Sequence, residues 1–246
     1  MARTARKQSD LGYLHLIVRG IGRQLLFEEY PDYQYYLSHL EKYSKETNVT
    51  ICAYCLMENH VHLLVFDKDN NTPVLMKKLG VSYSAYYNLK YERTGHLFQD
   101  RYLSEPINDE DYLITVFRYI LNNPQKAGIS QASAYEWSSY RFYGRTDSFV
   151  DTSMFIDMIG NMAEYSKYIA AKNEDLCMEI NLRPKMSDSK ARTVIQKLLN
   201  AESGTILQSY DSSKRNAALR SLKENGLTVR QIERLTGINR GIIQKA

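Results

Sequence analysis

The sequence predicts an α+β fold, in which a ferredoxin-like antiparallel sheet carries helices on one face and is followed by a further helix and a small all-α domain. Strand-like and helix-like segments alternate in the order β-α-β-β-α-β over residues 12–106, which is the order of the split βαβ arrangement. Residues 186–246 show helical patterns only. The chain has 246 residues, 43% of them hydrophobic and 24% charged, which suits a globular protein with room for two domains.

Six segments make up the β-α-β-β-α-β order. The predicted strands are residues 12–18, 50–56, 61–66 and 101–106, and the predicted helices are residues 31–46 and 72–91. A short hairpin at residues 57–59 joins the second and third strands. Thr72 is predicted as the N-cap of the second helix, because Pro73 suits the first helical position.

The next helix begins after Asp109, an N-cap residue whose acidic neighbours favour the positive end of a helix, and should stop before Pro124. Residues 130–150 have no clear pattern. We expect a first domain over residues 1–150, a helical connector over residues 151–185 and a second domain over residues 186–246. The boundary should lie near Arg183, Pro184 and Lys185, where the chain becomes polar and then basic.

The positive charge is concentrated in the last quarter of the chain. Residues 186–246 contain 11 Lys and Arg against 5 Asp and Glu, a net charge of +6, whereas residues 1–185 contain 21 against 23, a net charge of −2. A basic domain of this kind favours a phosphate-bearing partner such as nucleic acid.

The cysteines and the hydropathy pattern indicate a cytoplasmic protein. Three scattered cysteines do not form a disulfide framework, and no run of eighteen apolar residues could cross a membrane. Cys52 and Cys55 lie three positions apart on a predicted strand, so they should face opposite sides of the sheet and form no redox or zinc site.

Two histidines lie on one predicted strand. Residues two apart on a strand share a face, so His60 and His62 should point the same way, while Val61, Leu63 and Val65 pack on the other side. Two neighbouring imidazoles are natural ligands for one divalent metal. The alternative is a pair of half-exposed histidines without a ligand. Glu58 and Asn59 either orient the imidazoles or only form the hairpin turn.

Tyr119 and Asn123 are four residues apart on the helix after Asp109, so they should lie one above the other. An asparagine oxygen could complete a metal site with the two histidines, and the tyrosine would then lie beside the metal. Alternatively, Tyr119 is one of the many tyrosines with a structural role, and Asn123 only marks the end of the helix before Pro124.

Three ordered segments carry a family resemblance, namely residues 55–64 (CLMENHVHLL), 94–101 (TGHLFQDR) and 118–124 (RYILNNP). Together with residues 12–23, they resemble the REP-associated tyrosine transposases over roughly residues 5–150. These are relatives of the insertion-sequence transposases that use one tyrosine and a His-hydrophobe-His motif.

The resemblance implies a site and a mechanism. It implies that His60, His62 and Asn123 hold Mg²⁺ or Mn²⁺, and that Tyr119 attacks a phosphate of single-stranded DNA beside a hairpin. The product would be a 5′-phosphotyrosyl enzyme with a free 3′-hydroxyl, formed by a monomer or a homodimer. Residues suited to contact the DNA backbone or to stack on its bases are Arg3, Arg6, Lys7, Arg19, Arg23, Phe98, Arg101 and Tyr102. Each of these has a structural alternative.

Residues 228–245 follow a helix-turn-helix pattern. Thr228 and Gln231 have capping-box spacing, Gly237 suits a tight turn, and Asn239 can cap the next helix. Arg240, Gln244 and Lys245 would then be available to duplex DNA. The alternative is a small helical module that binds protein.

Three functions fit the sequence. The first is a transposase that cuts and rejoins single-stranded DNA, which needs all four residues His60, His62, Tyr119 and Asn123. The second is a domesticated, non-cleaving DNA-binding protein of the same fold. The third is a metal hydrolase that activates water, for which Tyr119 would be dispensable.

Overall fold

The computed structural model describes residues 8–173, 175, 177, 178 and 188–246. The chain divides into two compact units: the larger comprises Met1–Gly22 and Leu26–Leu182, and the smaller comprises Arg23–Leu25 and Arg183–Ala246. The predicted domain boundary at residues 183–185 and the arm residues Arg3, Arg6 and Lys7 lie outside the described residues.

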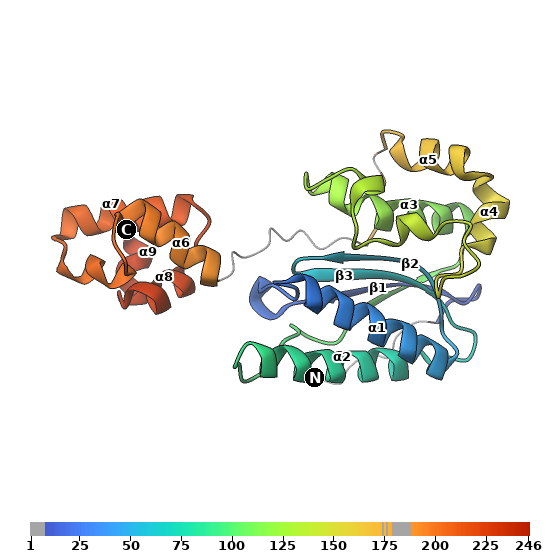
Figure 1. Ribbon diagram of the computed structural model, residues 1–246, viewed down its shortest axis with the longest axis horizontal. Helices are drawn as coiled ribbons and strands as arrows, with labels where there is room; N and C mark the ends of the chain where they lie inside the picture. Colours follow the sequence, from blue (N-terminus) through green and yellow to red (C-terminus); the bar gives the residue numbers. More distant parts are fainter. Residues whose placement is uncertain (1–7, 174, 176, 179–187) are drawn as a thin grey trace. The chain divides into compact units, whose positions relative to one another are not determined.

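The larger unit contains the predicted four-stranded antiparallel sheet (Figure 1). Its elements are β1 (Tyr13–Arg19), α1 (Tyr30–Thr47), β2 (Thr50–Met57), β3 (His60–Phe66), α2 (Thr72–Lys90) and β4 (Leu103–Ile107). The strand order β2-β3-β1-β4 places the first and third strands at the centre, as in a ferredoxin-like fold. The predicted fold class is therefore confirmed.

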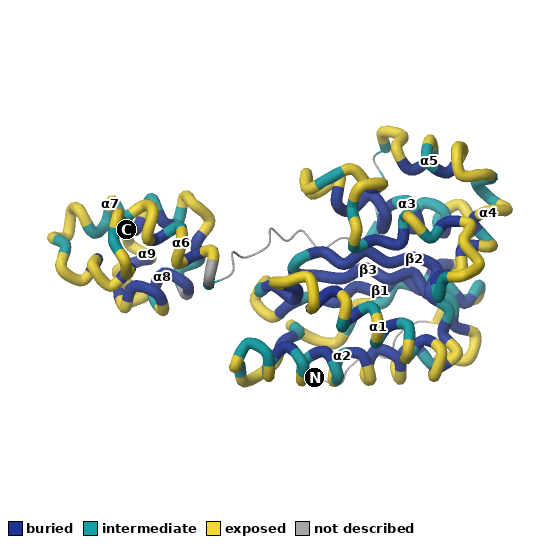
Figure 2. The backbone as a smooth tube through the Cα atoms, viewed as in Figure 1, coloured by how far each residue is buried: buried dark blue, intermediate teal, exposed yellow. Residues whose placement is uncertain are grey.

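The two faces of the sheet have different partners. Leu16, Val18, Val61 and Leu63 belong to the core cluster beneath α1 and α2. The opposite face packs against α3 (Glu110–Lys126), which lies across the sheet from α1 and α2 in Figure 1. Both faces are thus covered, and the central strands are buried along almost their whole length (Figure 2).

The start of α2 differs by one residue from the prediction. Thr72 is the first helical residue rather than the N-cap, which is Asn71. The Asp67 carboxylate accepts hydrogen bonds from the amides of Asn71 and Thr72 and from the Thr72 hydroxyl, so it supplies the acceptors that a cap usually provides.

Asp109 caps α3 as predicted, since its carboxylate accepts a hydrogen bond from the Tyr112 amide. The prediction that this helix stops before Pro124 is wrong, because α3 continues to Lys126. A proline removes one amide donor. Because Pro124 lies close to the end of the helix, the loss of this donor has only a local effect. The helix end is stabilised by hydrogen bonds from the Ala127 amide to the Asn123 carbonyl and from the Ile129 amide to the Pro124 carbonyl.

Residues 127–170 add short helices beside α3. These are η2 (Ala132–Ala134), η3 (Ser139–Phe142), α4 (Ser153–Ile159) and α5 (Met162–Ala170). Phe155 of α4 stacks on Phe117 of α3, with ring centroids 3.9 Å apart, and Tyr165 of α5 is buried in the same cluster. The segment around α4 and α5 therefore belongs to the core of the larger unit.

The prediction that Cys52 and Cys55 face opposite sides is wrong. The pairing of β2 with β3 shifts between Ile51 and Ala53, and this bulge places both thiols in the cluster under α3. Both are buried free thiols, and burial raises the pKa of each. Because the thiolate is the reactive and metal-binding form, this environment does not favour redox or zinc chemistry.

The smaller unit is helical. Its elements are α6 (Asp188–Leu199), η4 (Gly204–Ser209), α7 (Ser212–Glu224), α8 (Val229–Thr236) and α9 (Arg240–Lys245), around a core of its own. The capping box of Thr228 and Gln231 is present, Gly237 is left-handed at the end of α8, and Asn239 caps α9. Within the residues described in both units, no helix is long and apolar enough to cross a membrane.

Candidate functional site

His60 and His62 extend from β3 toward α3, so the prediction that they share a face is confirmed. They belong to alternate positions of the strand, and their ring centroids are 5.0 Å apart. His60 is 9% exposed and His62 is 1% exposed. Each Nδ1 has a partner: Asn59 Oδ1 lies 2.8 Å from that of His60, and His15 Nε2 lies 3.0 Å from that of His62.

Sequence reasoning missed His15, which is completely buried on β1. Its ring stacks on that of His62 with a centroid distance of 5.3 Å, and its Nδ1 lies 3.4 Å from Glu105 Oε2 on β4. Glu105 also accepts a hydrogen bond from the Tyr112 hydroxyl at 3.0 Å. The available signal was a lone histidine within the otherwise apolar core of a strand, where an unpaired polar group is costly.

Tyr119 and Asn123 of α3 lie over the histidines. The Tyr119 ring centroid is 5.7 Å from that of His62 and 6.0 Å from that of His15. Asn123, one turn further, donates from Nδ2 to the Tyr119 carbonyl at 3.0 Å and is also hydrogen-bonded to His60. The structure therefore brings together His60, His62, Tyr119 and Asn123, from two elements about sixty residues apart in sequence.

The imidazoles are held neutral. Burial lowers the pKa of His60 to about 4, although its hydrogen bond with Asn123 acts in the opposite direction. Burial also lowers the pKa of His62, and the neighbouring imidazoles of His60 and His15 lower it further. Burial lowers the pKa of His15 as well, although the Glu105 carboxylate acts in the opposite direction. A neutral imidazole keeps one nitrogen lone pair, which is the form that binds a metal.

The side chains at this site fit a divalent metal, provided that an amide oxygen serves as the third protein ligand. In the part of the chain that the structure describes, no three His, Cys, Asp or Glu side chains lie close enough to hold an ion together. His60 and His62 each have Nδ1 engaged, so Nε2 is the nitrogen left for a ligand bond. A third protein ligand would have to be the Asn123 oxygen, since its amide nitrogen is bonded to Tyr119.

Lys126 of α3 lies beside the Tyr119 ring, whereas Arg118 is paired with Asp175. Lys126 Nζ lies 4.5 Å from the Tyr119 ring centroid and donates to the Asp175 carbonyl at 2.9 Å. Arg118 forms a two-pronged ion pair with the Asp175 carboxylate, with N–O distances of 2.6 and 2.7 Å. Arg19, one of the predicted DNA contacts, is the cross-strand partner of His60 and is partly exposed.

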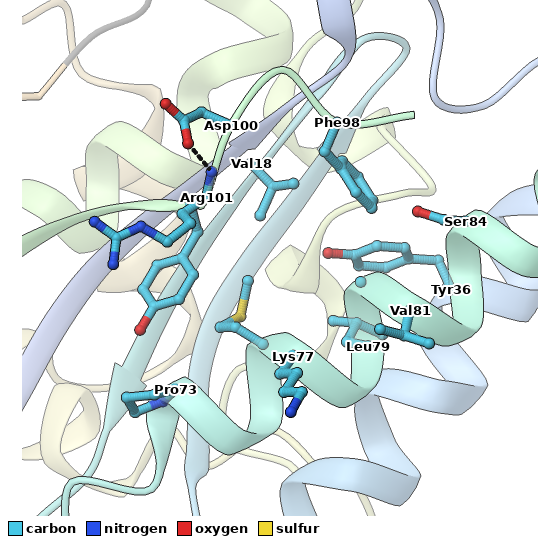
Figure 3. A pocket seen from close by; sticks show the side chains of 13 residues that line it. Val18, Tyr36, Pro73, Lys77, Leu79, Val81, Ser84, Phe98, Asp100 and Arg101 are labelled. Carbon is cyan, nitrogen blue, oxygen red and sulfur yellow. Dashed lines mark hydrogen bonds between the residues drawn. The ribbon is translucent and has the colours of Figure 1, made fainter. Parts of the chain in front are cut away.

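Phe98 and Arg101 lie elsewhere than the histidines. They line a cavity of about 640 Å³ with Val18, Tyr102 and residues of α2 (Figure 3). Val18 belongs to the α1 and α2 face of the sheet, whereas His60 and His62 lie on the α3 face. Arg23 is exposed in η1 (Ile21–Arg23).

The remaining predicted contacts belong to the smaller unit. Arg240, Gln244 and Lys245 are all exposed on α9. Arg240 and Gln244 are four apart and share a helix face, whereas Ile243 is buried and fixes α9 to the core of this unit.

The larger unit thus combines a ferredoxin-like sheet, a His-hydrophobe-His strand and a helix that carries Tyr119. Residues 8–123 match the family model described as "Transposase IS200 like", and this match spans the sheet, both histidines, Tyr119 and Asn123. Residues 8–123 are therefore similar to the IS200-like transposases.

Solved structures that are similar to the chain include two transposases. One is a REP-associated tyrosine transposase bound to a REP hairpin, with 20% identity, a TM-score of 0.48 and coverage of 57% of this chain and 84% of that chain. The other is a putative transposase from Deinococcus radiodurans R1, with 22% identity, a TM-score of 0.33 and coverage of 49% and 97%. No curated protein matches the chain.

Proposed function

We propose that the protein is a metal-dependent tyrosine transposase that nicks and rejoins single-stranded DNA beside a hairpin through a 5′-phosphotyrosine intermediate. The observation that carries the proposal is the position of Tyr119, whose ring lies over His62 while Asn123 of the same helix contacts His60. The match to the IS200-like transposases supports a DNA-cleaving role. The hairpin substrate comes from the resemblance of residues 55–64, 94–101 and 118–124 to the REP-associated enzymes.

Tyr119 is the nucleophile in this proposal. Its phenolic oxygen attacks the scissile phosphorus, the bond from phosphorus to the 3′ oxygen breaks, and that oxygen leaves as a 3′-hydroxyl after taking up a proton. The 5′ phosphate remains linked to Tyr119. Attack by a second 3′-hydroxyl then reverses the step, joins two strands and restores the phenol without any external energy source.

His60, His62 and Asn123 are proposed to hold Mg²⁺ or Mn²⁺, which would polarise the scissile phosphate and offset the charge developing on its oxygens. Lys126 adds positive charge beside Tyr119, where a phosphate would enter. Arg19, opposite His60 on the neighbouring strand, is proposed to contact the DNA backbone.

The first prediction concerns Tyr119. Wild type should form a covalent protein–DNA adduct with labelled single-stranded hairpin DNA from the flanks of its gene in Mn²⁺, and EDTA should abolish it. Tyr119→Phe should lower adduct formation and cleavage on the order of 10³-fold or more, because only the attacking oxygen is removed. A denaturing gel separates free DNA, cleaved DNA and adduct.

Tyr30→Phe is the matched control, since Tyr30 is 52% exposed and lies outside the site; it should behave like wild type. Cleavage that survives Tyr119→Phe without an adduct would instead identify a hydrolase with a metal-activated water. Binding without cleavage by wild type on every hairpin tested would favour a domesticated DNA-binding protein.

A further inference from the structure

Three side chains from neighbouring strands form a continuous polar chain in the core under α3. His62 of β3 contacts His15 of β1 through Nδ1 and Nε2, which are 3.0 Å apart. His15 Nδ1 in turn lies 3.4 Å from Glu105 Oε2 of β4. The strand register produces this line, because His15 is the direct partner of Glu105 and His62 is the partner of Ile17, two residues further along β1.

Glu105, at the outer end of this chain, determines the direction in which each hydrogen bond is donated. An ionised carboxylate only accepts hydrogen bonds, and Glu105 already accepts one from the Tyr112 hydroxyl. His15 must therefore donate from Nδ1, and a neutral His15 then carries its lone pair on Nε2. That lone pair accepts from His62 Nδ1, which leaves the lone pair of His62 on Nε2. Each imidazole is thus restricted to one of its two tautomers.

His60 lies outside this chain. Its Nδ1 lies 2.8 Å from Asn59 Oδ1, and Asn123 of α3 is a second partner of its side chain. His15 is 0% exposed, and an apolar residue at this position would avoid the cost of burying an imidazole. The presence of a histidine here therefore favours a functional role.

We propose that Glu105 and His15 are positioning residues that fix the tautomer and the orientation of His62, so that its Nε2 faces the divalent cation. This inference rests on the metal site of the proposed function. Groups that orient metal-binding imidazoles in this way typically change metal affinity about 10- to 100-fold when they are altered. In this protein the Glu105 carboxylate would act on His62 through the His15 imidazole and not by a direct hydrogen bond.

The test uses the full chain without DNA and follows two signals. The dissociation constant for Mn²⁺ is measured by titration calorimetry, and the tautomer of His62 is measured by long-range ¹H–¹⁵N NMR of the metal-free protein. Glu105→Gln keeps the shape of the side chain, but its amide can also donate and no longer dictates the direction of the chain. We expect Mn²⁺ binding about 10- to 100-fold weaker, a mixture of His62 tautomers and an unchanged thermal unfolding midpoint.

Glu110→Gln is the matched control, because it removes the same charge from an exposed position at the start of α3; its Mn²⁺ affinity should stay within about twofold of wild type. His15→Leu interrupts the chain, and Glu105→Gln should then have no further effect on Mn²⁺ binding in that background. Equal losses from Glu105→Gln with and without His15 would show that Glu105 does not act through His15.

The results also separate this proposal from the proposed function. Wild-type Mn²⁺ affinity together with a single His62 tautomer in Glu105→Gln would overturn the positioning role and leave the transposase proposal intact. A wild type that binds neither Mn²⁺ nor Mg²⁺ would overturn both the metal site of the proposed function and the positioning role of Glu105 and His15.

Discussion

The Asp32 side chain is completely buried where α1 meets α2, and it accepts hydrogen bonds from five groups. Two are the amides of Glu28 and Glu29 at the start of α1, and the others come from α2 and its C-cap: Tyr86, Lys90 and Tyr91. Burial alone would raise the pKa of Asp32, but the hydrogen bonds from Lys90, Tyr91 and the two amides outweigh it and lower the pKa. One carboxylate therefore satisfies a helix end and fastens α1 to α2.

A lowered pKa in the folded state gives a definite pH dependence. The stabilisation from ionised Asp32 is fully present above the unfolded pKa of about 3.9, and it is lost as the pH falls through the lower folded pKa. Asp32→Asn should therefore lower the free energy of unfolding by about 1–3 kcal/mol at pH 7, and by less in acid.

Urea unfolding at pH 7 and at the lowest pH where both proteins remain folded measures this difference. Glu41→Gln changes a partly exposed carboxylate on the same helix, which pairs with Lys45 at the surface, and should have little effect. Identical urea midpoints for Asp32→Asn and wild type at pH 7 would contradict the role of Asp32.

Residue-level prediction succeeded where it depended on local periodicity. The alternation of a strand is enough to place His60 and His62 on one face, and helical spacing is enough to place Tyr119 above Asn123. His15 and Glu105 were not predictable in this way, because their meeting depends on the register of three strands. The bulge at Cys52 was not predictable either, because it also depends on strand pairing. The shift places Cys52 on the same side of the sheet as Cys55, whereas strict alternation would place it on the other side.

At the scale of elements, α3 determines the geometry of the site, because it carries both Tyr119 and Asn123. The Asp109 carboxylate caps this helix through the Tyr112 amide at 2.7 Å. Asp109→Ala should lower the free energy of unfolding by about 1 kcal/mol, the usual loss when an N-cap acceptor is removed. Thermal or urea unfolding of the full chain measures the change in the larger unit.

Asp111→Ala is a suitable comparison for that cap. Asp111 lies in the same first turn and is exposed, so its removal should cost only a few tenths of a kcal/mol through the helix dipole. Equal losses in the two variants would mean that the charge at the start of α3 matters and the cap geometry does not. The sequence predicted this helix start but not the continuation through Pro124, because a proline penalty is local and tertiary packing can outweigh it.

At the scale of the whole molecule, each of the two units has its own hydrophobic core. The order of elements was sufficient to predict the ferredoxin-like sheet, because connections in this arrangement allow few topologies. The place of α4 and α5 was not predictable, since their burial against α3 depends on contacts such as Phe117 with Phe155 that no local pattern encodes.

The helix-turn-helix pattern of residues 228–245 predicts that the smaller unit binds duplex DNA and that this binding depends on salt. Arg240 and Lys245 are exposed on α9, within a segment whose net charge is +6 from 11 basic and 5 acidic residues. Replacing both by Gln in the full chain should weaken binding to duplex DNA. It should also reduce the slope of log affinity against log salt by up to about 2, because each lost phosphate contact removes roughly 0.9.

Fluorescence anisotropy over a salt series gives both the affinity and the slope, and adduct formation on the single-stranded hairpin serves as an internal control that should not change. Lys197→Gln, at an exposed position on α6, should reduce neither duplex affinity nor slope beyond a general charge effect. If the α9 variant and wild type gave the same slope on every duplex tested, the helical pair α8 and α9 would not be the DNA-contacting element. The protein-binding alternative for this unit would then be favoured, because its basic surface would have no measurable contact with phosphate.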